Sequence, residues 1–386
     1  MKIMISVGEA SGDMHAASAI QQLRDMSGGR RIEAFGMGGN RLAACDTELL
    51  VDNRHHAVMG LVEVLHKYPQ LRANLTTLKK AMKERQPDVL LLVDYPHFNM
   101  KLAAEAKSLG VPVLYYIAPK VWASRPGRLQ ELTELVDHMA VIFPFEVPLF
   151  TDAGISTTYV GNPVLENKSL LTARSTRLAH EQTIALLPGS RKSEISNLLS
   201  PMLEAAKLIT TDHPDIKFVL PVAETLDEAL IQDTIAGSDL NIELIEAANY
   251  SKLRQCKAAI VSSGTATLEL AMLEVPMVVA YRMNTLSYRV LKRWLTIRHI
   301  SLVNIIAKRE VVPEFLQDDV TAENLHLEIK QLIGLGESRA DQLKGFDEVF
   351  KILSRKELKT SLATVILELY QQARKSNELK ATATIN

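Results

Sequence analysis

The stretch KIMISVGEASGD, residues 2–13, joins a mostly apolar run to a polar loop that contains two glycines. The run shows little polar alternation, as expected for a strand that is covered on both faces. A helical pattern follows Asp13, and glycine allows a tight turn between the two elements. The stretch therefore predicts a strand, a loop and a helix, with Glu9 and Ser11 in the loop at the carboxyl end of the strand.

Strands and helices alternate in the same way along both halves of the chain. In the first half, further strands are expected at 31–36, 89–94, 111–118 and 139–143. In the second half, strands are expected at 183–189, 217–223, 241–246, 258–264 and 276–281, with helical patterns at about 193–211, 225–235, 265–274 and 285–295. This alternation is typical of parallel sheets with right-handed crossover connections.

The chain has 386 residues, which is enough for two or three domains of ~150 residues. Its two halves predict an α/β protein of two doubly wound, Rossmann-like domains whose parallel sheets face each other across a cleft. We expect the first domain at 1–165, the second at 166–344 and a polar tail at 377–386. Whether terminal helices within 345–376 complete the first domain is left open.

Composition excludes several classes of protein. Apolar residues make up 47% and charged residues 23% of the chain, and the net charge is -1, which argues against disorder and against binding of nucleic acid through bulk positive charge. Cys45 and Cys256 are the two cysteines, which favours a reducing, cytoplasmic setting. The first apolar run is too short for a signal peptide, and no run of ~18 apolar residues predicts a membrane-spanning helix.

Common catalytic motifs are absent from the sequence. The chain has no G-x-x-x-x-G-K-[ST], no G-x-S-x-G and no H-E-x-x-H, which argues against a P-loop nucleotidase, a hydrolase nucleophile elbow and a zinc protease. It also lacks the Asp-x-Asp pair that binds metal in many sugar-nucleotide transferases. No metal and no cofactor are therefore expected.

The segment VLLLVDYPHFN, residues 89–99, begins with an apolar strand that has Asp88 directly before it and Asp94 at its end. Asp94 ends the strand, where partial desolvation raises a carboxyl pKa and suits it to accept a proton. His97 titrates near neutrality and can do the same work, and Asn99 follows it. Asp88 precedes the strand and should lie at its far end. Local capping and packing remain the alternative for this segment.

Two later segments predict sites for anions. In IALLPGSRKSEI, residues 184–195, Arg191 follows a strand and precedes a helix, whose free amides attract negative charge. In the segment 259–276, Ser263, Gly264 and Thr265 lie at a similar junction, and Glu269 one turn later suits ribose hydroxyls. Two such helix starts in one domain indicate a nucleoside diphosphate, although a surface arginine and a capped core helix remain alternatives.

Eleven strings, in order along residues 1–335, resemble the lipid-A-disaccharide synthase family, inverting glycosyltransferases with the GT-B fold. They are GEASGD (8–13), GMGGNR (36–41), VMGLVEVL (58–65), VDYPHFN (93–99), YYIAPKVWASRPGR (115–128), FPFE (143–146), YVGNP (159–163), LLPGSRKSEI (186–195), SSGTATLE (262–269), YRMN (281–284) and SLVNIIAKREVVPEFLQ (301–317).

The resemblance implies a substrate pair. UDP-2,3-diacylglucosamine would be the donor and 2,3-diacylglucosamine 1-phosphate the acceptor, and the product would be a β-1,6-linked lipid A disaccharide 1-phosphate with UDP released. The second domain would hold UDP, and the first would hold the acceptor and the base. The implied setting is the cytoplasm at the inner-membrane surface, with no nucleic acid; a homodimer stays open.

The resemblance also implies roles for individual residues. Arg191 and the amides of Ser263, Gly264 and Thr265 would neutralise the departing diphosphate, and Glu269 would bind ribose. Sugar contacts would come from Glu9, Ser11, Asp13 and Asn99, and Asn304 would be a cleft residue, although a packed segment is nearly as good an interpretation of its surroundings.

The family pattern leaves the general base open. Many members carry a second acid where this chain has His97. The base is therefore Asp94, His97 alone, or a role that the two share. Asp88 matches an acid of the family and stays a candidate.

Residues 58–82 carry apolar side chains flanked by cations, a pattern of helices that dock on anionic membranes. The alternative is a helix packed on the sheet. For the whole chain, two other functions stay open: another GT-B sugar-nucleotide enzyme such as a UDP-N-acetylglucosamine epimerase, and a sugar-nucleotide-binding protein without catalysis.

Overall fold

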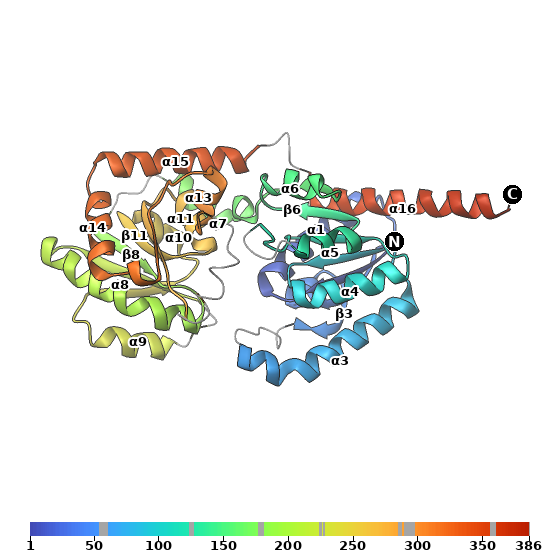
Figure 1. Cartoon of the computed structure of the whole chain (residues 1–386), viewed down its shortest axis with the longest axis horizontal. Coiled ribbons are helices and arrows are strands. Elements are labelled where there is room, and N and C mark those ends of the chain that lie inside the picture. Colours follow the sequence, from blue (N-terminus) through green and yellow to red (C-terminus); the bar gives the residue numbers. More distant parts are fainter. Residues whose placement is uncertain are drawn as a thin grey trace. The chain divides into compact units, whose positions relative to one another are not determined.

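The computed structural model describes residues 1–53, 61–122, 127–176, 181–223, 226, 228–284, 288, 298–355 and 360–385, without the side chains of 10, 61–68, 230, 376–377 and 379–385. The chain divides into two compact units (Figure 1). The first contains Met1–Pro163 and Arg355–Asn386, and the second contains Val164–Ser354. The predicted helix at 285–295 falls mostly outside the described residues.

The first unit is built around a seven-stranded parallel sheet of order β3-β2-β1-β4-β5-β6-β7. Its strands are β1 (Lys2–Val7), β2 (Glu33–Gly38), β3 (Thr47–Asp52), β4 (Val89–Val93), β5 (Val113–Tyr116), β6 (His138–Val141) and β7 (Ser156–Tyr159). Its helices are α1 (Ala10–Met26), α2 (Asn40–Ala44), α3 (Leu61–Arg85), α4 (Pro96–Ser108), α5 (Gly127–Leu135), α6 (Glu146–Asp152) and α16 (Leu362–Ile385).

The second unit repeats this winding with a six-stranded parallel sheet of order β10-β9-β8-β11-β12-β13. Its strands are β8 (Thr183–Leu187), β9 (Lys217–Val222), β10 (Ile242–Glu246), β11 (Ala258–Ser262), β12 (Met277–Tyr281) and β13 (Glu314–Leu316). Its helices are α7 (Lys168–Ser175), α8 (Lys192–Asp212), α9 (Glu228–Ala236), α10 (Tyr250–Gln255), α11 (Thr265–Met272), α13 (Leu302–Ala307), α14 (Ala322–Ile333) and α15 (Glu337–Leu353), with short 3-10 turns at Pro163–Glu166 and Gln317–Asp319.

Both sheets reverse their winding at an internal strand pair, β1–β4 in the first unit and β8–β11 in the second. Connections before and after the reversal run to opposite faces of the sheet, so the two loops at the carboxyl ends of these strands separate and leave a crevice for a ligand. We call each of these places a switch point. The predicted α/β class with two Rossmann-like, parallel-sheet units is confirmed.

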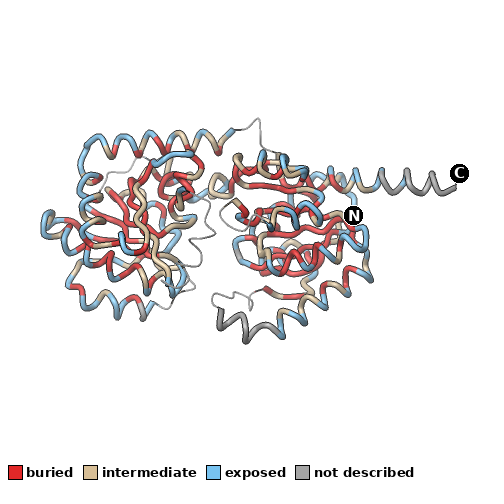
Figure 2. The backbone as a smooth tube through the Cα atoms, viewed as in Figure 1, coloured by how far each residue is buried: buried red, intermediate tan, exposed pale blue. Residues whose placement is uncertain are grey.

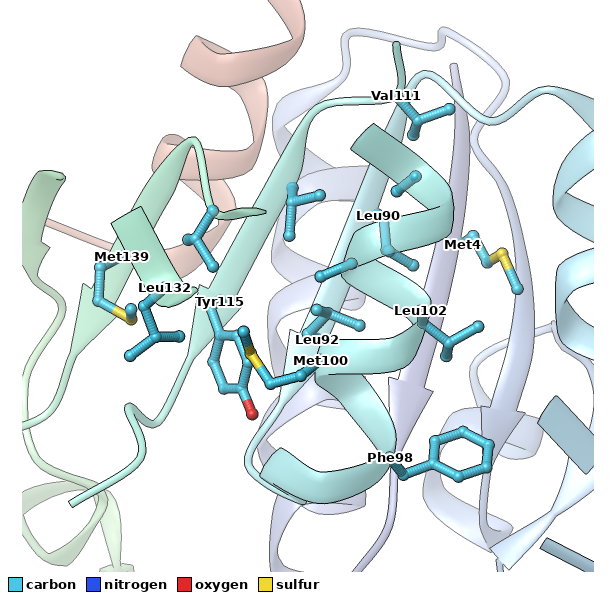
Figure 3. Close-up of a cluster of buried hydrophobic side chains, with 14 of the residues drawn as sticks. Met4, Leu90, Leu92, Phe98, Met100, Leu102, Val111, Tyr115, Leu132 and Met139 are labelled. Atoms are coloured by element: carbon cyan, nitrogen blue, oxygen red, sulfur yellow. The ribbon is translucent and has the colours of Figure 1, made fainter. Parts of the chain in front are cut away.

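The central strands are buried on both faces, which explains their unbroken apolar sequence (Figure 2). Side chains alternate between two cores, as the period of a strand requires. Leu90 and Leu92 of β4 join the core under α3, α4 and α5, whereas Leu91 and Val93 join the core under α1 and α16. Figure 3 shows the first of these cores, where side chains of α4 meet those of β1, β4 and β5.

The second half of helix α3 packs against this core. Leu78 is fully buried, and Leu71 and Leu75 pack against the same cluster. These three leucines therefore fit the alternative interpretation of the segment, a helix packed on the sheet, with Leu71 and Leu75 only partly buried. Residues 58–60 and the side chains of 61–68 lie outside the described part of the chain.

The two terminal helices pack on different units. Helix α15 belongs to the second unit, so residues 345–353 do not complete the first. Helix α16 covers the first sheet beside α1, through Ala363 and Ile366. It continues to Ile385 through the residues expected as a polar tail, since neither glycine nor proline interrupts that stretch.

Sequence analysis did not predict three of the strands, β3, β7 and β13. Each of them lies at an edge of its sheet. An edge strand is covered less than a central one, so its sequence can be short and polar. The segment STTY of β7 and the three-residue β13 show this directly, because neither contains the long Val, Leu and Ile run that marks the central strands.

Gly36 of β2 generates a stability prediction. Its φ is +142°, and a Cβ added there would lie 2.0 Å from the backbone oxygen of Ile5 in the neighbouring strand. We expect Gly36→Ala to lower the free energy of unfolding by about 3 kcal/mol or more, because backbone strain and overpacking add together. Urea unfolding of the purified protein measures this loss.

Gly110→Ala is the matched control. Gly110 also has a positive φ, +70°, but no atom lies within 4 Å of the added Cβ. Only the strain of the left-handed backbone remains, about 1–2 kcal/mol. Equal losses in the two variants would contradict the steric argument for Gly36.

Candidate functional site

The first switch point brings together the loops that follow β1 and β4. Val7 pairs with Val93 in the parallel ladder, so Glu9 and Asp94 leave the sheet side by side. Glu9 and Ser11 are exposed and Asp94 is half-buried. Two carboxylates therefore share the crevice where an open parallel sheet binds its ligand.

The backbone at Asp94 is strained. Asp94 and Tyr95 have φ values of +46° and +50°, in the left-handed region that costs non-glycine residues ~1–2 kcal/mol each. Three hydrogen bonds hold this turn: Tyr115 Oη and Asn99 Nδ2 each donate to the Asp94 carbonyl at 2.7 Å, and the Asp94 amide donates to Tyr116 O at 3.0 Å. Strain that the surroundings enforce in this way is typical of functional sites.

Burial raises the pKa of the Asp94 carboxyl, and the negative charge of Glu9 raises it further. The ring of Tyr95 covers the start of the first loop, since a Cβ on Gly8 would lie 2.4 Å from it. Burial and then Glu9 also raise the pKa of the Tyr95 hydroxyl. The site therefore favours the protonated forms of both groups more than water does, which brings a carboxylate base closer to neutrality.

Asp13 and Asn99 are placed to hold loops. Asp13 is 3% exposed, and its two oxygens accept from the amides of Gly39, at 2.6 Å, and Arg41, at 2.9 Å. Asn99 is fully buried and accepts from Ser6 Oγ at 2.6 Å while its amide nitrogen donates to the Asp94 carbonyl. Their geometry supports positioning roles in place of the predicted direct contacts with sugar.

The other two predicted catalytic residues of this unit are His97 and Asp88. His97 is exposed in the first turn of α4. Asp88 lies before β4, and its carboxylate accepts from the Lys2 backbone amide at 2.7 Å. Asp88 and Asp94 flank the five-residue strand and are therefore roughly 20 Å apart. The structure therefore places Asp88 at the far end of β4, as expected from the sequence, and does not bring it to the switch point.

The second switch point brings together the loops that follow β8 and β11, since Leu187 pairs with Val261. Arg191 caps the start of α8 and is 55% exposed. Glu194 organises this start: its Oε2 accepts from the amides of Ser190 and Arg191 at 2.9 and 3.2 Å. Gly189 is required because its φ is +122° and an added Cβ would lie 2.2 Å from Glu194 Oε2.

The loop after β11 carries the predicted phosphate amides. Gly264 caps α11, and Thr265 is exposed at its first position. Ser263 Oγ donates to the Ile300 carbonyl at 2.8 Å. The loop therefore presents free amides at a helix start, in an arrangement suited to an anion.

Glu269, within α11, is part of a hydrogen-bonded chain. Tyr250 Oη donates to Glu269 Oε1 at 3.1 Å and accepts from Asn167 Nδ2 at 3.0 Å. Burial raises the pKa of Glu269, and Tyr250 partly opposes that rise. Sequence analysis missed Tyr250, since a tyrosine that begins a short helix gives no signal by itself.

Asn304 differs from the predicted cleft residue, because it is fully buried. Its Oδ1 accepts from the amides of Val311 and Val312 at 2.7 and 3.0 Å, and its Nδ2 donates to Val312 O and Glu314 Oε1, both at 2.8 Å. Glu314 Oε2 in turn accepts from the Ile300 amide at 2.8 Å. Asn304 thus acts on the Ser263 loop through Glu314 and Ile300.

We expect Asn304→Ala to lower the free energy of unfolding by at least about 3 kcal/mol, because several buried polar groups lose their partners together. Urea unfolding again measures the change. The control is Asn324→Ala. Among the described residues, this side chain donates one hydrogen bond, from Nδ2 to Asp319 O at 2.9 Å. The free energy of unfolding should therefore fall by about 1 kcal/mol or less. A smaller loss at Asn304 than at Asn324 would argue against the buried network.

Comparison with known proteins identifies relatives along nearly the whole chain. A family model described as lipid-A-disaccharide synthetase matches residues 3–367. The lipid-A-disaccharide synthase of Myxococcus xanthus is 41% identical over 381 residues, which cover 97% of this chain and 98% of that protein. Both spans include the loops of the two switch points.

Solved structures resemble the fold at low sequence identity. The Neisseria meningitidis UDP-GlcNAc 2-epimerase bound to UDP-GlcNAc matches with a TM-score of 0.57 and 13% identity, covering 92% of this chain and 99% of that one. The glycotransferase of kitacinnamycin matches with a TM-score of 0.59 and 16% identity, covering 95% and 98%. At such identities the likeness concerns the two-unit fold alone.

Proposed function

The chain belongs to the lipid-A-disaccharide synthase family, glycosyltransferases of lipid A biosynthesis, and from that premise we propose which groups carry the reaction. The substrates are lipid A precursors. We propose UDP-2,3-diacylglucosamine as donor and 2,3-diacylglucosamine 1-phosphate as acceptor. The acceptor 6-hydroxyl attacks the anomeric carbon with inversion, a β-1,6 disaccharide 1-phosphate forms, and UDP leaves.

The second unit takes the UDP part of the donor. Negative charge grows on the leaving diphosphate in the transition state, and groups that act on it there accelerate the reaction. The exposed guanidinium of Arg191 and the amides at the start of α11, at Gly264 and Thr265, supply such groups. Glu269 takes the ribose hydroxyls, with its carboxyl oriented by Tyr250.

The first unit takes the acceptor, and Asp94 is the general base. The observation that carries this assignment is the place of Asp94: half-buried, at the end of a central strand, in a strained turn beside Glu9. His97 is exposed one helical turn away and serves the acceptor sugar instead, with Glu9 and Ser11. Asp13 and Asn99 hold the two loops.

The proposed reaction is tested by UDP release. We expect release from UDP-2,3-diacylglucosamine in detergent micelles to require the acceptor and to persist with EDTA. Arg191→Ala should lower kcat by ~10²–10³, because it removes stabilisation of the leaving group, whereas Lys192→Ala, next along the chain, should leave the rate near that of the wild type. Release without acceptor, or UDP binding with no release at all, would overturn the proposal.

Asp94 accepts a proton only when ionised, so activity should fall as pH falls through its raised pKa. Glu9→Gln removes the neighbouring negative charge, lowers the pKa of Asp94 and moves this acid limb of kcat/KM to lower pH. Asp94→Asn should lower kcat by ~10²–10⁴, and His97→Gln by much less. Initial rates across the pH range measure all three.

Ser11→Ala is the control for the pH shift, because it changes the same exposed loop without changing its charge. Its acid limb should coincide with that of the wild type. An unmoved limb in Glu9→Gln, or a larger loss at His97 than at Asp94, would transfer the role of base to His97.

We propose that the chain works in the cytoplasm at the inner-membrane surface. None of the helices within the described residues has the length and apolarity of a membrane span. Acylated substrates nevertheless require access to lipid, and the sequence at the start of α3 is apolar, with Leu61, Val62, Val64 and Leu65.

We expect the protein to float with liposomes that contain anionic lipid and to be released by salt, which screens exposed charge. Leu65→Glu should reduce flotation. Leu109→Glu, which changes an exposed leucine elsewhere in the first unit, should not. Equal flotation of the two variants would remove the start of α3 from membrane binding.

A further inference from the structure

Glu146 is a buried carboxyl group that the proposed reaction does not use. It belongs to the segment FPFE and begins α6, after the end of β6. Its exposed fraction is 2%. A carboxyl group in such a place is costly unless its oxygens are bonded and its charge has a purpose.

Both oxygens of Glu146 accept hydrogen bonds. Trp122 Nε1 donates to Oε1 at 3.0 Å, and the Phe143 amide donates to Oε2 at 3.2 Å. A backbone interaction with Ile142 also favours the ionised form. A protonated carboxyl would direct its own hydrogen toward one of these donors, so the arrangement fits the carboxylate.

Trp122 ends the segment 117–122, which leaves the sheet beside Asp94. The preceding residue, Tyr116, pairs with Val93 and accepts from the Asp94 amide. The segment begins with strain, since Ile117 is a β-branched residue with a φ of +59°. Such a segment keeps its conformation only if its far end is held.

Lys120 is the exposed side chain in the middle of this segment, between the buried residues Pro119 and Val121. Its positive charge lowers the pKa of Asp94 and also acts on Glu146. Lys120 therefore lies within electrostatic reach of both carboxyl groups.

These contacts form a continuous path from Glu146 to the proposed base. We propose that Glu146 is a positioning residue: its carboxylate fixes Trp122, and through Trp122 the segment 117–122, and thereby sets the position of Lys120 relative to Asp94. This inference rests on the proposed role of Asp94 and adds a residue to it that lies on a different strand connection.

The proposal has a pH dependence of its own. Burial raises the pKa of Glu146 to about 7. Below that pH, Glu146 is protonated, the hold on Trp122 weakens, and Lys120 supports Asp94 less well. Above that pH, the Glu146 carboxylate holds the segment 117–122, and the lysine charge helps to keep Asp94 ionised.

The first test compares acid limbs of kcat/KM. Glu146→Gln and Lys120→Met should each move the Asp94 limb to higher pH, because each removes the effect of the lysine charge on Asp94. The double variant should shift the limb no further than the larger single shift, since both changes act through the same charge. An unmoved limb in Glu146→Gln, or shifts that add fully, would overturn the proposal, because a residue that only supports folding lowers the rate at every pH.

The second test measures the protonation of Glu146 through the fluorescence of Trp122, without any substrate. Trp122 and Trp294 are the two tryptophans, so a Trp294→Phe background leaves Trp122 as the single emitter. Its fluorescence should titrate near pH 7, and Glu146→Gln should abolish that transition. A transition that survives in the Gln variant would overturn the proposal, whereas loss of UDP release in the wild type would refute the proposed function and leave this titration intact.

Trp122→Phe covers the case in which Glu146→Gln fails to fold. It removes the indole N–H and keeps the ring and Glu146, so the acid limb of kcat/KM should again move to higher pH. A melting curve confirms folding of each variant. A folded Trp122→Phe protein with the wild-type limb would contradict the path from Glu146 to Asp94.

Discussion

The pairing of β1 with β4, repeated by β8 with β11, is the constraint on which both candidate sites depend. A parallel sheet can wind outward in two directions only if one central pair separates the two halves. The loops after that pair then diverge, because their helices cover opposite faces of the sheet. In each unit, strand ends, helix starts and polar side chains therefore meet at this pair.

The two switch points carry opposite chemistry. In the first unit, Glu9 and Asp94 concentrate negative charge, and burial brings the pKa of Asp94 upward. In the second unit, Arg191 and the start of α11 present positive charge and free amides. A base belongs where a hydroxyl must lose a proton, and cations belong where a diphosphate departs. In the reaction that we propose, the same winding thus serves both halves of the glycosyl transfer.

Strained backbone lowers the stability of the first unit at its switch point. Asp94, Tyr95 and Ile117 all occupy left-handed backbone, next to the carboxyl ends of β4 and β5. Glu146 adds a further cost: since its pKa is about 7, above the ordinary 4.5, its contribution to stability is present at low pH and is lost as pH rises through 7. The hydrogen bonds that Glu146 accepts from Trp122 and Phe143 partly offset this cost.

The sequence by itself determined the fold class, the central strands and the loops that bear Glu9, Asp94, Arg191 and Ser263, because buried strands require long apolar runs and the family strings lie at their ends. It did not reveal three of the four edge strands, β3, β7 and β13, whose partial exposure weakens that signal. Only the tertiary structure buried Asn304 and joined Glu146 to Trp122. These outcomes depend on which strands are neighbours and which oxygens find donors, and such contacts between distant residues leave no periodic trace in the chain.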